Sequence, residues 1–158
     1  MIEALEPAIR CGHLKLYRSS GLRYWHACIA KNTAGVTADA SYHVLCNVDG
    51  DNLLTLDFVE QCLTIGARIK ADKVACAQFY ASNEAGTYGH IMIQRDMFHK
   101  LGGYDESFHP VGCQDRDLIY RVLACANVGT TIRVDDNRMV GTSIDNKPKE
   151  ANAKQSLS

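Results

Sequence analysis

The chain of 158 residues lacks several features that mark whole classes of protein. It has no basic run and a net charge of −1, which argues against nucleic acid or an anionic membrane as the main partner. Its longest uncharged run, residues 122–132, is far too short to span a bilayer. Two glutamates among the first six residues stand where a signal peptide has a basic start and an apolar core. We therefore expect a cytoplasmic protein without a transmembrane segment.

The spacing of cysteines and glycines argues against several further classes of protein. Seven cysteines are widely spread and none forms Cys-x-x-Cys, which fits neither a zinc site nor a disulfide framework. Most lie in apolar runs, where a free cysteine behaves as a small buried hydrophobic residue, so we expect a reducing compartment. No local pattern selects a catalytic Cys-His pair among the six histidines. The glycine motifs of dinucleotide sites and of P-loops are also absent.

Composition and apolar spacing predict one soluble domain over residues 1–145, followed by a loose polar tail over residues 146–158. Helical spacing predicts helices over residues 2–10, 24–40, 56–69, 95–101 and 115–127. Beta-prone runs predict strands over residues 14–17, 44–48, 73–80, 88–94 and 130–134. Alternation of the two early in the chain favours an α/β sheet with parallel pairs. The strand over 44–48 is apolar on both faces, which is typical of a buried parallel strand.

Two carboxylates follow this strand. Asp49 and Asp51 stand one residue apart, and open α/β sheets usually keep their ligand sites at such strand ends. Hard cations such as Mg²⁺ and Mn²⁺ prefer carboxylate oxygens. The same residues also suit an ordinary turn, because Asp, Gly and Asn favour turns. The motif therefore predicts a metal site only in combination with the rest of the chain.

Two further polar clusters occur at predicted element ends, over residues 101–106 and 112–117. Each has a purely structural interpretation. Gly102 and Gly103 suit the C-terminus of the preceding helix, and Thr55 suits the N-cap of the helix over 56–69. Asp115 or Asp117 suits the N-cap of the last helix. Asp117 could also form an i,i+4 surface pair with Arg121.

Together, the clusters resemble family-2 glycosyltransferases with the GT-A fold, and are similar to the C-terminal part of galactosyltransferases. The resemblance rests on Lys-Asn at 31–32 and on Val-Leu-Cys-Asn-Val-Asp-Gly-Asp-Asn at 44–52. It rests further on residues 86–108, which include Leu-Gly-Gly-Tyr-Asp-Glu-Ser-Phe, and on Gly-Cys-Gln-Asp-Arg-Asp-Leu-Ile-Tyr-Arg at 112–121. Order and spacing agree over about residues 14–135. The resemblance implies an incomplete GT-A-type α/β fold, a mixed sheet flanked by helices.

The resemblance also implies a metal-dependent inverting sugar transfer. Asp51 would bind Mn²⁺ or Mg²⁺, and Asp49 would face the ribose of a UDP- or GDP-sugar or a metal-bound water. Lys31 and Asn32 would lie near the nucleotide. Asp115 would be the general base that deprotonates the hydroxyl of a carbohydrate or other acceptor. A single carboxylate opposite the leaving group suits one inverting displacement.

The acceptor side is implied by the same comparison. It would be shaped by Gly102, Gly103, Tyr104, Asp105, Glu106 and Gln114. Gln114 stands where the family usually has Glu, so a neutral amide replaces an acid. The family often supplies a further metal ligand, commonly His, after the last strand, and no His follows His109 here.

The largest departure is at the start of the chain, where only about one helix and one strand precede Lys31. The first nucleotide-binding half of a GT-A domain is therefore expected to be absent, which makes a fragment or truncated remnant with a binding role the alternative function. Unpaired strand edges would then favour self-association. A metal-dependent phosphohydrolase using Asp49 and Asp51 is a third interpretation, and it lacks the other carboxylates and His that such sites gather.

Overall fold

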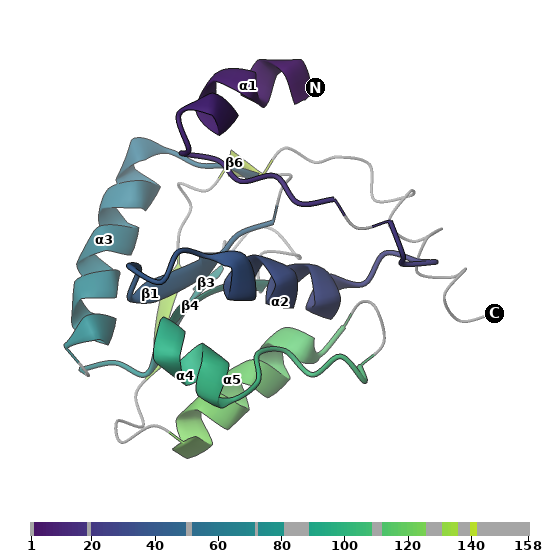
Figure 1. The fold of residues 1–158 in the computed structure, drawn as a ribbon. Coiled ribbons are helices and arrows are strands. Elements are labelled where there is room, and N and C mark those ends of the chain that lie inside the picture. Colours follow the sequence, from purple (N-terminus) through teal and green to yellow (C-terminus); the bar gives the residue numbers. More distant parts are fainter. Residues whose placement is uncertain are drawn as a thin grey trace.

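The computed structural model describes residues 2–18, 20–49, 52–71, 73–80, 89–108, 112–125, 131–135 and 140–141. Figure 1 shows a central sheet with helices on both sides, and helix α1 lying apart from it. The helices are α1 (Ile2–Arg10), α2 (Ala27–Thr37), α3 (Leu56–Lys70), α4 (Arg95–Lys100) and α5 (Gln114–Cys125). The strands are β1 (Val44–Asn47), β2 (Asn52–Leu53), β3 (Cys76–Tyr80), β4 (His90–Gln94), β5 (Thr131–Asp135) and β6 (Val140–Gly141).

The main sheet has the strand order β1-β4-β3-β5. Strand β4 runs antiparallel to both β1 and β3, whereas β3 and β5 are parallel. A separate short pair joins β2 to β6. The prediction of a mixed α/β sheet flanked by helices is confirmed. The prediction of a buried parallel strand at 44–48 is wrong, because β1 is an edge strand, only partly buried and antiparallel to its neighbour.

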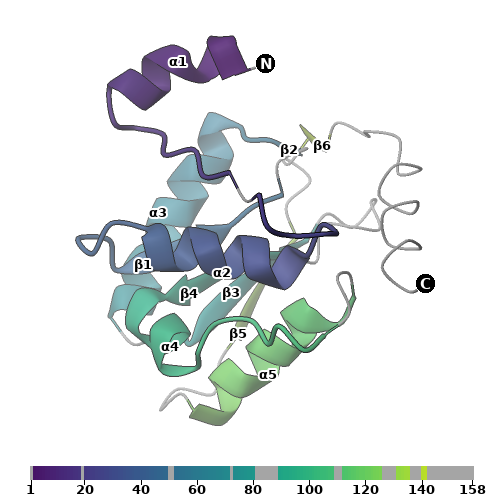
Figure 2. The ribbon, with the colours of Figure 1, turned by 45° about the vertical axis from the view of Figure 1, so that its right-hand side comes forward.

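Two hydrophobic clusters fill the space on either side of the sheet, because successive strand residues point to opposite faces. Ile91 and Ile93 of β4 face the cluster beneath α2, α4 and α5. Met92, between them, faces the cluster beneath α3, where the Phe58 and Phe79 rings lie 5.1 Å apart. Turning the molecule by 45° shows α2 crossing in front of the sheet and α5 beside β5 (Figure 2). The chain thus forms an α/β/α sandwich.

Local signals place most element ends. Helix α1 spans the residues predicted for it, and α3 begins after Thr55, whose side chain accepts a hydrogen bond from the Phe58 amide at 3.2 Å. Helix α4 ends at two glycines with left-handed backbone, Gly102 at φ 74° and Gly103 at φ 73°. Both predicted end signals are therefore confirmed.

Two predicted elements differ from the structure. Residues 14–17 form neither strand nor helix, and the Leu16 and Tyr17 side chains are half exposed. A beta-prone run becomes a strand only where a neighbour supplies hydrogen bonds, and none lies alongside within the described residues. Helix α2 begins at Ala27 rather than near residue 24, because His26 has an extended backbone (φ −135°, ψ 109°).

None of the helices in the described ranges is long and apolar enough to cross a membrane. The predicted polar tail over residues 146–158 lies outside the described residues.

Two helical glycines provide a matched test of the packing between α2 and α4. A Cβ on Gly35 would lie 2.5 Å from Cε1 of Phe98, a ring buried in the core, whereas a Cβ on Gly66 would meet Cε of Met92 at 3.5 Å. Alanine improves helix propensity equally at both sites. We expect Gly35→Ala to lower the free energy of unfolding by about 1–3 kcal/mol and Gly66→Ala to leave it unchanged or raise it by up to about 1 kcal/mol.

Urea denaturation of both variants measures this difference. Equal effects of the two substitutions would contradict the close approach of α2 to Phe98.

Candidate functional site

An ion pair between Lys31 and Asp115 lies at the centre of the polar residues on the α2 side of the sheet. Lys31 extends from α2, and its Nζ atom is 2.8 Å from Oδ1 of Asp115 in the first turn of α5. Their side chains are only 13% and 20% exposed. Helix α2 buries Ala27 and Cys28 against the sheet, which directs Lys31, one turn further along, inward. Two motifs separated by 84 residues therefore meet in space.

Tyr104 covers this ion pair. Its ring centroid is 5.2 Å from Lys31 Nζ, close enough for a cation–π contact, and the residue is 3% exposed. Burial raises the pKa of the Tyr104 phenol far above its usual range, and the charge of Asp115, a hydrogen bond to Asp115 and the charge of Asp49 raise the pKa further. The phenol is therefore neutral at physiological pH and acts as a hydrogen-bond donor to the carboxylate.

Asn32 fixes the segment that carries Tyr104. Its Oδ1 atom accepts a hydrogen bond from the Tyr104 amide at 2.7 Å, and its Nδ2 atom donates to the Tyr104 carbonyl at 2.8 Å. Nδ2 also donates to Oε1 of Glu106 at 2.8 Å. A single amide side chain thereby satisfies both backbone groups of one residue. Asn32 and the predicted acceptor-side residues Tyr104 and Glu106 are thus in direct contact.

Two glycines allow the close approach of these groups. A Cβ on Gly103 would collide with Asn32 Oδ1, and the left-handed backbone of Gly103 disfavours any side chain as well. A Cβ on Gly89 would lie 3.2 Å from both Asp115 Oδ2 and Lys31 Nζ. Only a residue without a side chain leaves this space open beside the ion pair.

A second pair of polar groups joins the end of β1 to the start of β4. His90, fully buried, has its Nε2 atom 3.6 Å from Oδ2 of Asp49, and Asn47 Nδ2 donates to the Gly89 carbonyl at 3.0 Å. Asn47, Gly89 and His90 are not among the predicted site residues. One signal could have found them: each is a polar residue or a glycine at the end of an otherwise apolar strand.

Two of the other predicted site residues, Gly102 and Asp105, are exposed. The carboxylate of Asp105 is exposed and accepts a hydrogen bond from the Ser107 amide at 2.8 Å, which lowers its pKa. A Cβ on Gly102 would meet nothing within 4 Å. Gln114 is 5% exposed, and its Oε1 atom accepts no hydrogen bond from the described part of the chain. Asp51 lies outside the described residues.

Helix α5 begins at Gln114, so Asp115 and Asp117 lie in its first turn rather than at the N-cap, and the N-cap prediction is wrong. The preceding Cys113 has a left-handed backbone (φ 62°). The predicted i,i+4 pair is confirmed, because Arg121 Nε lies 2.8 Å from Asp117 Oδ2. Arg121 also donates to the Leu101 carbonyl at 3.1 Å, which ties α5 to the C-terminus of α4.

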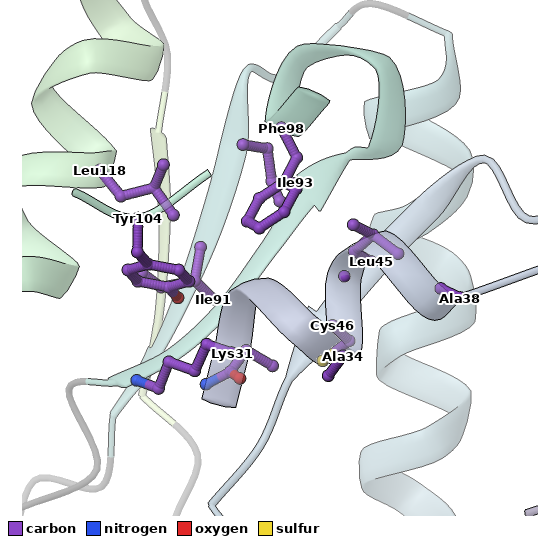
Figure 3. Close-up of a pocket in the computed structure, with 12 residues that line it drawn as sticks. Lys31, Ala34, Ala38, Leu45, Cys46, Ile91, Ile93, Phe98, Tyr104 and Leu118 are labelled. Carbon is purple, nitrogen blue, oxygen red and sulfur yellow. The ribbon is translucent and has the colours of Figure 1, made fainter. Parts of the chain in front are cut away.

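A cavity of about 160 Å³ opens between α2 and the sheet, next to the ion pair. Figure 3 shows Lys31 and Tyr104 at one end, and apolar side chains along the rest. The apolar lining includes Ala34 and Ala38 of α2, Leu45 of β1, Ile91 and Ile93 of β4, and Leu118 of α5. The cavity is therefore polar only at the end where the predicted site residues meet.

Asp49 is the member of the predicted metal-binding pair that lies in the described part of the chain. Within the described ranges, no three His, Cys, Asp or Glu side chains gather closely enough to hold a metal ion. Asp49 and His90 supply at most two donors, and Asp51, the principal predicted ligand, lies outside those ranges. The described residues alone do not make a complete metal site.

Comparisons with protein-family models, with curated proteins and with solved structures find no match to this chain.

The Asn32 contacts generate a prediction about stability. Asn32→Asp removes the two Nδ2 hydrogen bonds and sets a carboxylate against Glu106. We expect the free energy of unfolding to fall by about 1–3 kcal/mol, because the Tyr104 carbonyl loses its partner. Thr33→Ala is the control, since the exposed Thr33 hydroxyl donates to the Ile29 carbonyl of its own helix and its loss should cost less than about 0.5 kcal/mol. Chemical denaturation that ranks the variants equally would contradict the role of Asn32.

Proposed function

We propose that this chain is a glycosyltransferase-type domain with a GT-A-like sheet, which transfers a sugar from a nucleotide diphosphate donor to a hydroxyl acceptor with inversion. One observation carries the proposal. Lys31 and Asp115, from two of the motifs behind the resemblance, meet at 2.8 Å across 84 residues of sequence, beside the end of the strand that leads to Asp49. Tyr104, from a third motif, covers them.

In this proposal Asp115 is the base that removes the acceptor proton. Lys31 binds Oδ1, and the neutral Tyr104 phenol donates to the same carboxylate. Both contacts orient the group before substrate arrives, which is what general-base catalysis requires. The absence of a side chain at Gly89 keeps the space next to Oδ2 open. The acceptor hydroxyl would enter at this point.

The nucleotide would lie on the Asp49 side of Tyr104. Lys31 supplies a positive charge that can approach phosphate oxygens, and Asn32 keeps the 104–106 segment in place. A Mn²⁺ or Mg²⁺ ion held by Asp51 with Asp49 would neutralise the charge that develops on the diphosphate. The donor would be a UDP- or GDP-sugar, and the acceptor a carbohydrate or another hydroxyl compound.

A second candidate is a binding domain of the same ancestry without catalysis. The observation that favours it is that Asp115 already has a basic partner at 2.8 Å and Asp49 has His90 at 3.6 Å. Carboxylates compensated inside the protein can serve the fold alone.

Thermal unfolding with UDP or GDP and Mn²⁺ tests donor binding. We expect wild type and Asp115→Asn to be stabilised by about 2–3 kcal/mol at ligand concentrations near 100 times the dissociation constant. Asp51→Ala should lose this stabilisation.

Release of nucleoside diphosphate from UDP- and GDP-sugars, in the presence of simple sugar acceptors, tests catalysis. Asp115→Asn should lower turnover roughly 10²–10⁴-fold, while Asp57→Asn, an exposed acid in the first turn of α3, should leave it unchanged. Nucleotide stabilisation without turnover in wild type would favour the binding domain. Full turnover in Asp115→Asn would show that the base is wrong. Wild type that shows no nucleotide binding and no turnover would contradict the proposed function.

A further inference from the structure

Cys46 and Cys62 face each other across the layer between β1 and α3. Val44, Val48 and Cys62 pack against the hydrophobic cluster beneath α3. Side chains two residues apart point to the same face of a strand, so Cys46 faces α3 together with Val44 and Val48. Helix α3 packs on β1, and the Cys62 thiol is near enough to Cys46 to raise the pKa of Cys46. Two thiols from different elements therefore lie next to each other in the reduced protein.

Both cysteines are in the reduced form, and neither is sealed in the core. Cys46 is exposed on the edge strand and Cys62 is partly buried on α3, whereas Cys28 and Cys76 are fully buried. Strand β1 is hydrogen-bonded to one neighbour, β4, within the described sheet. A strand held on one side can move more readily than a central strand to reach the Cα separation that a disulfide requires.

We infer that Cys46 and Cys62 are a site of reversible oxidative modification, at which a small-molecule disulfide of the glutathione type converts the dithiol into an intramolecular disulfide. One thiol loses its proton, and the thiolate attacks a sulfur of glutathione disulfide, which releases one glutathione thiolate. The second thiolate attacks the protein sulfur of this mixed disulfide and releases the other glutathione. The two glutathione thiolates take up the two protons, so the cysteines are oxidised and glutathione disulfide is reduced.

Proximity decides which product accumulates. The neighbouring Cys62 thiol raises the pKa of Cys46 well above its usual range, which slows the first attack by Cys46. Once a mixed disulfide forms at either sulfur, the other thiol already lies beside it, so the second step is intramolecular. The bond would close the segment of residues 47–61, which carries Asp49. The inference is independent of the proposed sugar transfer.

Peptide mapping of the full chain after incubation with glutathione disulfide tests this inference. Residues 32–68 contain no internal Lys or Arg, so both cysteines lie in one tryptic peptide. After alkylation under denaturing conditions, we expect the mass of this peptide to be lower than that of the reduced peptide by two hydrogens, with no alkyl group or glutathione attached. Cleavage at Glu60 should give two fragments that separate only after reduction.

Variants identify the partner of each sulfur. Cys62→Ser should leave Cys46 as a stable mixed disulfide with glutathione, and Cys46→Ser should do the same for Cys62. Cys125→Ser, an exposed cysteine at the end of α5, should leave the internal bond unchanged. The inference is overturned if wild type carries glutathione on Cys46 or Cys62 to the same extent as the variants. It is also overturned if Cys46 and Cys62 are both alkylated in a sample in which Cys11, Cys113 and Cys125 have reacted with glutathione disulfide.

Discussion

The ion pair between Lys31 and Asp115 is the constraint on which the rest of the polar site depends. It connects α2 to α5 over the edge of the sheet, with both side chains mostly shielded from water. A charge in that position is costly without a partner, so each residue requires the other. Tyr104 can lie over the pair only because the positive charge faces its ring and the carboxylate accepts from its hydroxyl. The site is therefore organised by mutual compensation of charge.

The backbone around the pair is arranged to allow that contact. Asn32, the next residue on α2, holds the 104–106 segment by three hydrogen bonds. The segment reaches Asn32 because α4 ends in two left-handed glycines, one of which passes too close to the amide for any side chain. Arg121 ties the same helix end to α5. The candidate site residues thus rest on hydrogen bonds between elements rather than on any one loop.

The sequence predicts what depends on local signals and on motif order. Thr55 and the glycine pair mark helix ends because capping and positive φ are local properties. The position of β1 could not be read from the run 44–48, because edge strands and buried strands both accept apolar residues and the direction of β4 depends on the path of the chain. In the sequence His90 has the pattern of an ordinary core residue, and only the structure shows that Asp49 lies beside it.

The candidate site divides in the same way. The resemblance names Lys31, Asn32, Tyr104 and Asp115 among its site residues, and a chain of contacts links these four in the structure. Lys31 binds Asp115 and faces the Tyr104 ring, and Asn32 binds the Tyr104 backbone. Asp105 and Gly102 belong to the same motif but turn outward, since a run of adjacent residues cannot all face one point. Which residue of this motif faces inward depends on the hydrogen bonds between Asn32 and Tyr104, and these bonds join residues 72 apart in sequence.

A double-mutant cycle on Lys31 and Asp115 tests the central claim most directly. The free energies of unfolding of wild type, Lys31→Met, Asp115→Asn and the double variant are measured by urea denaturation in the same buffer. The account predicts that each single substitution is destabilising and that the double variant is more stable than their sum by on the order of 1–3 kcal/mol. A coupling energy within about 0.3 kcal/mol of zero, as for independent sites, would contradict it.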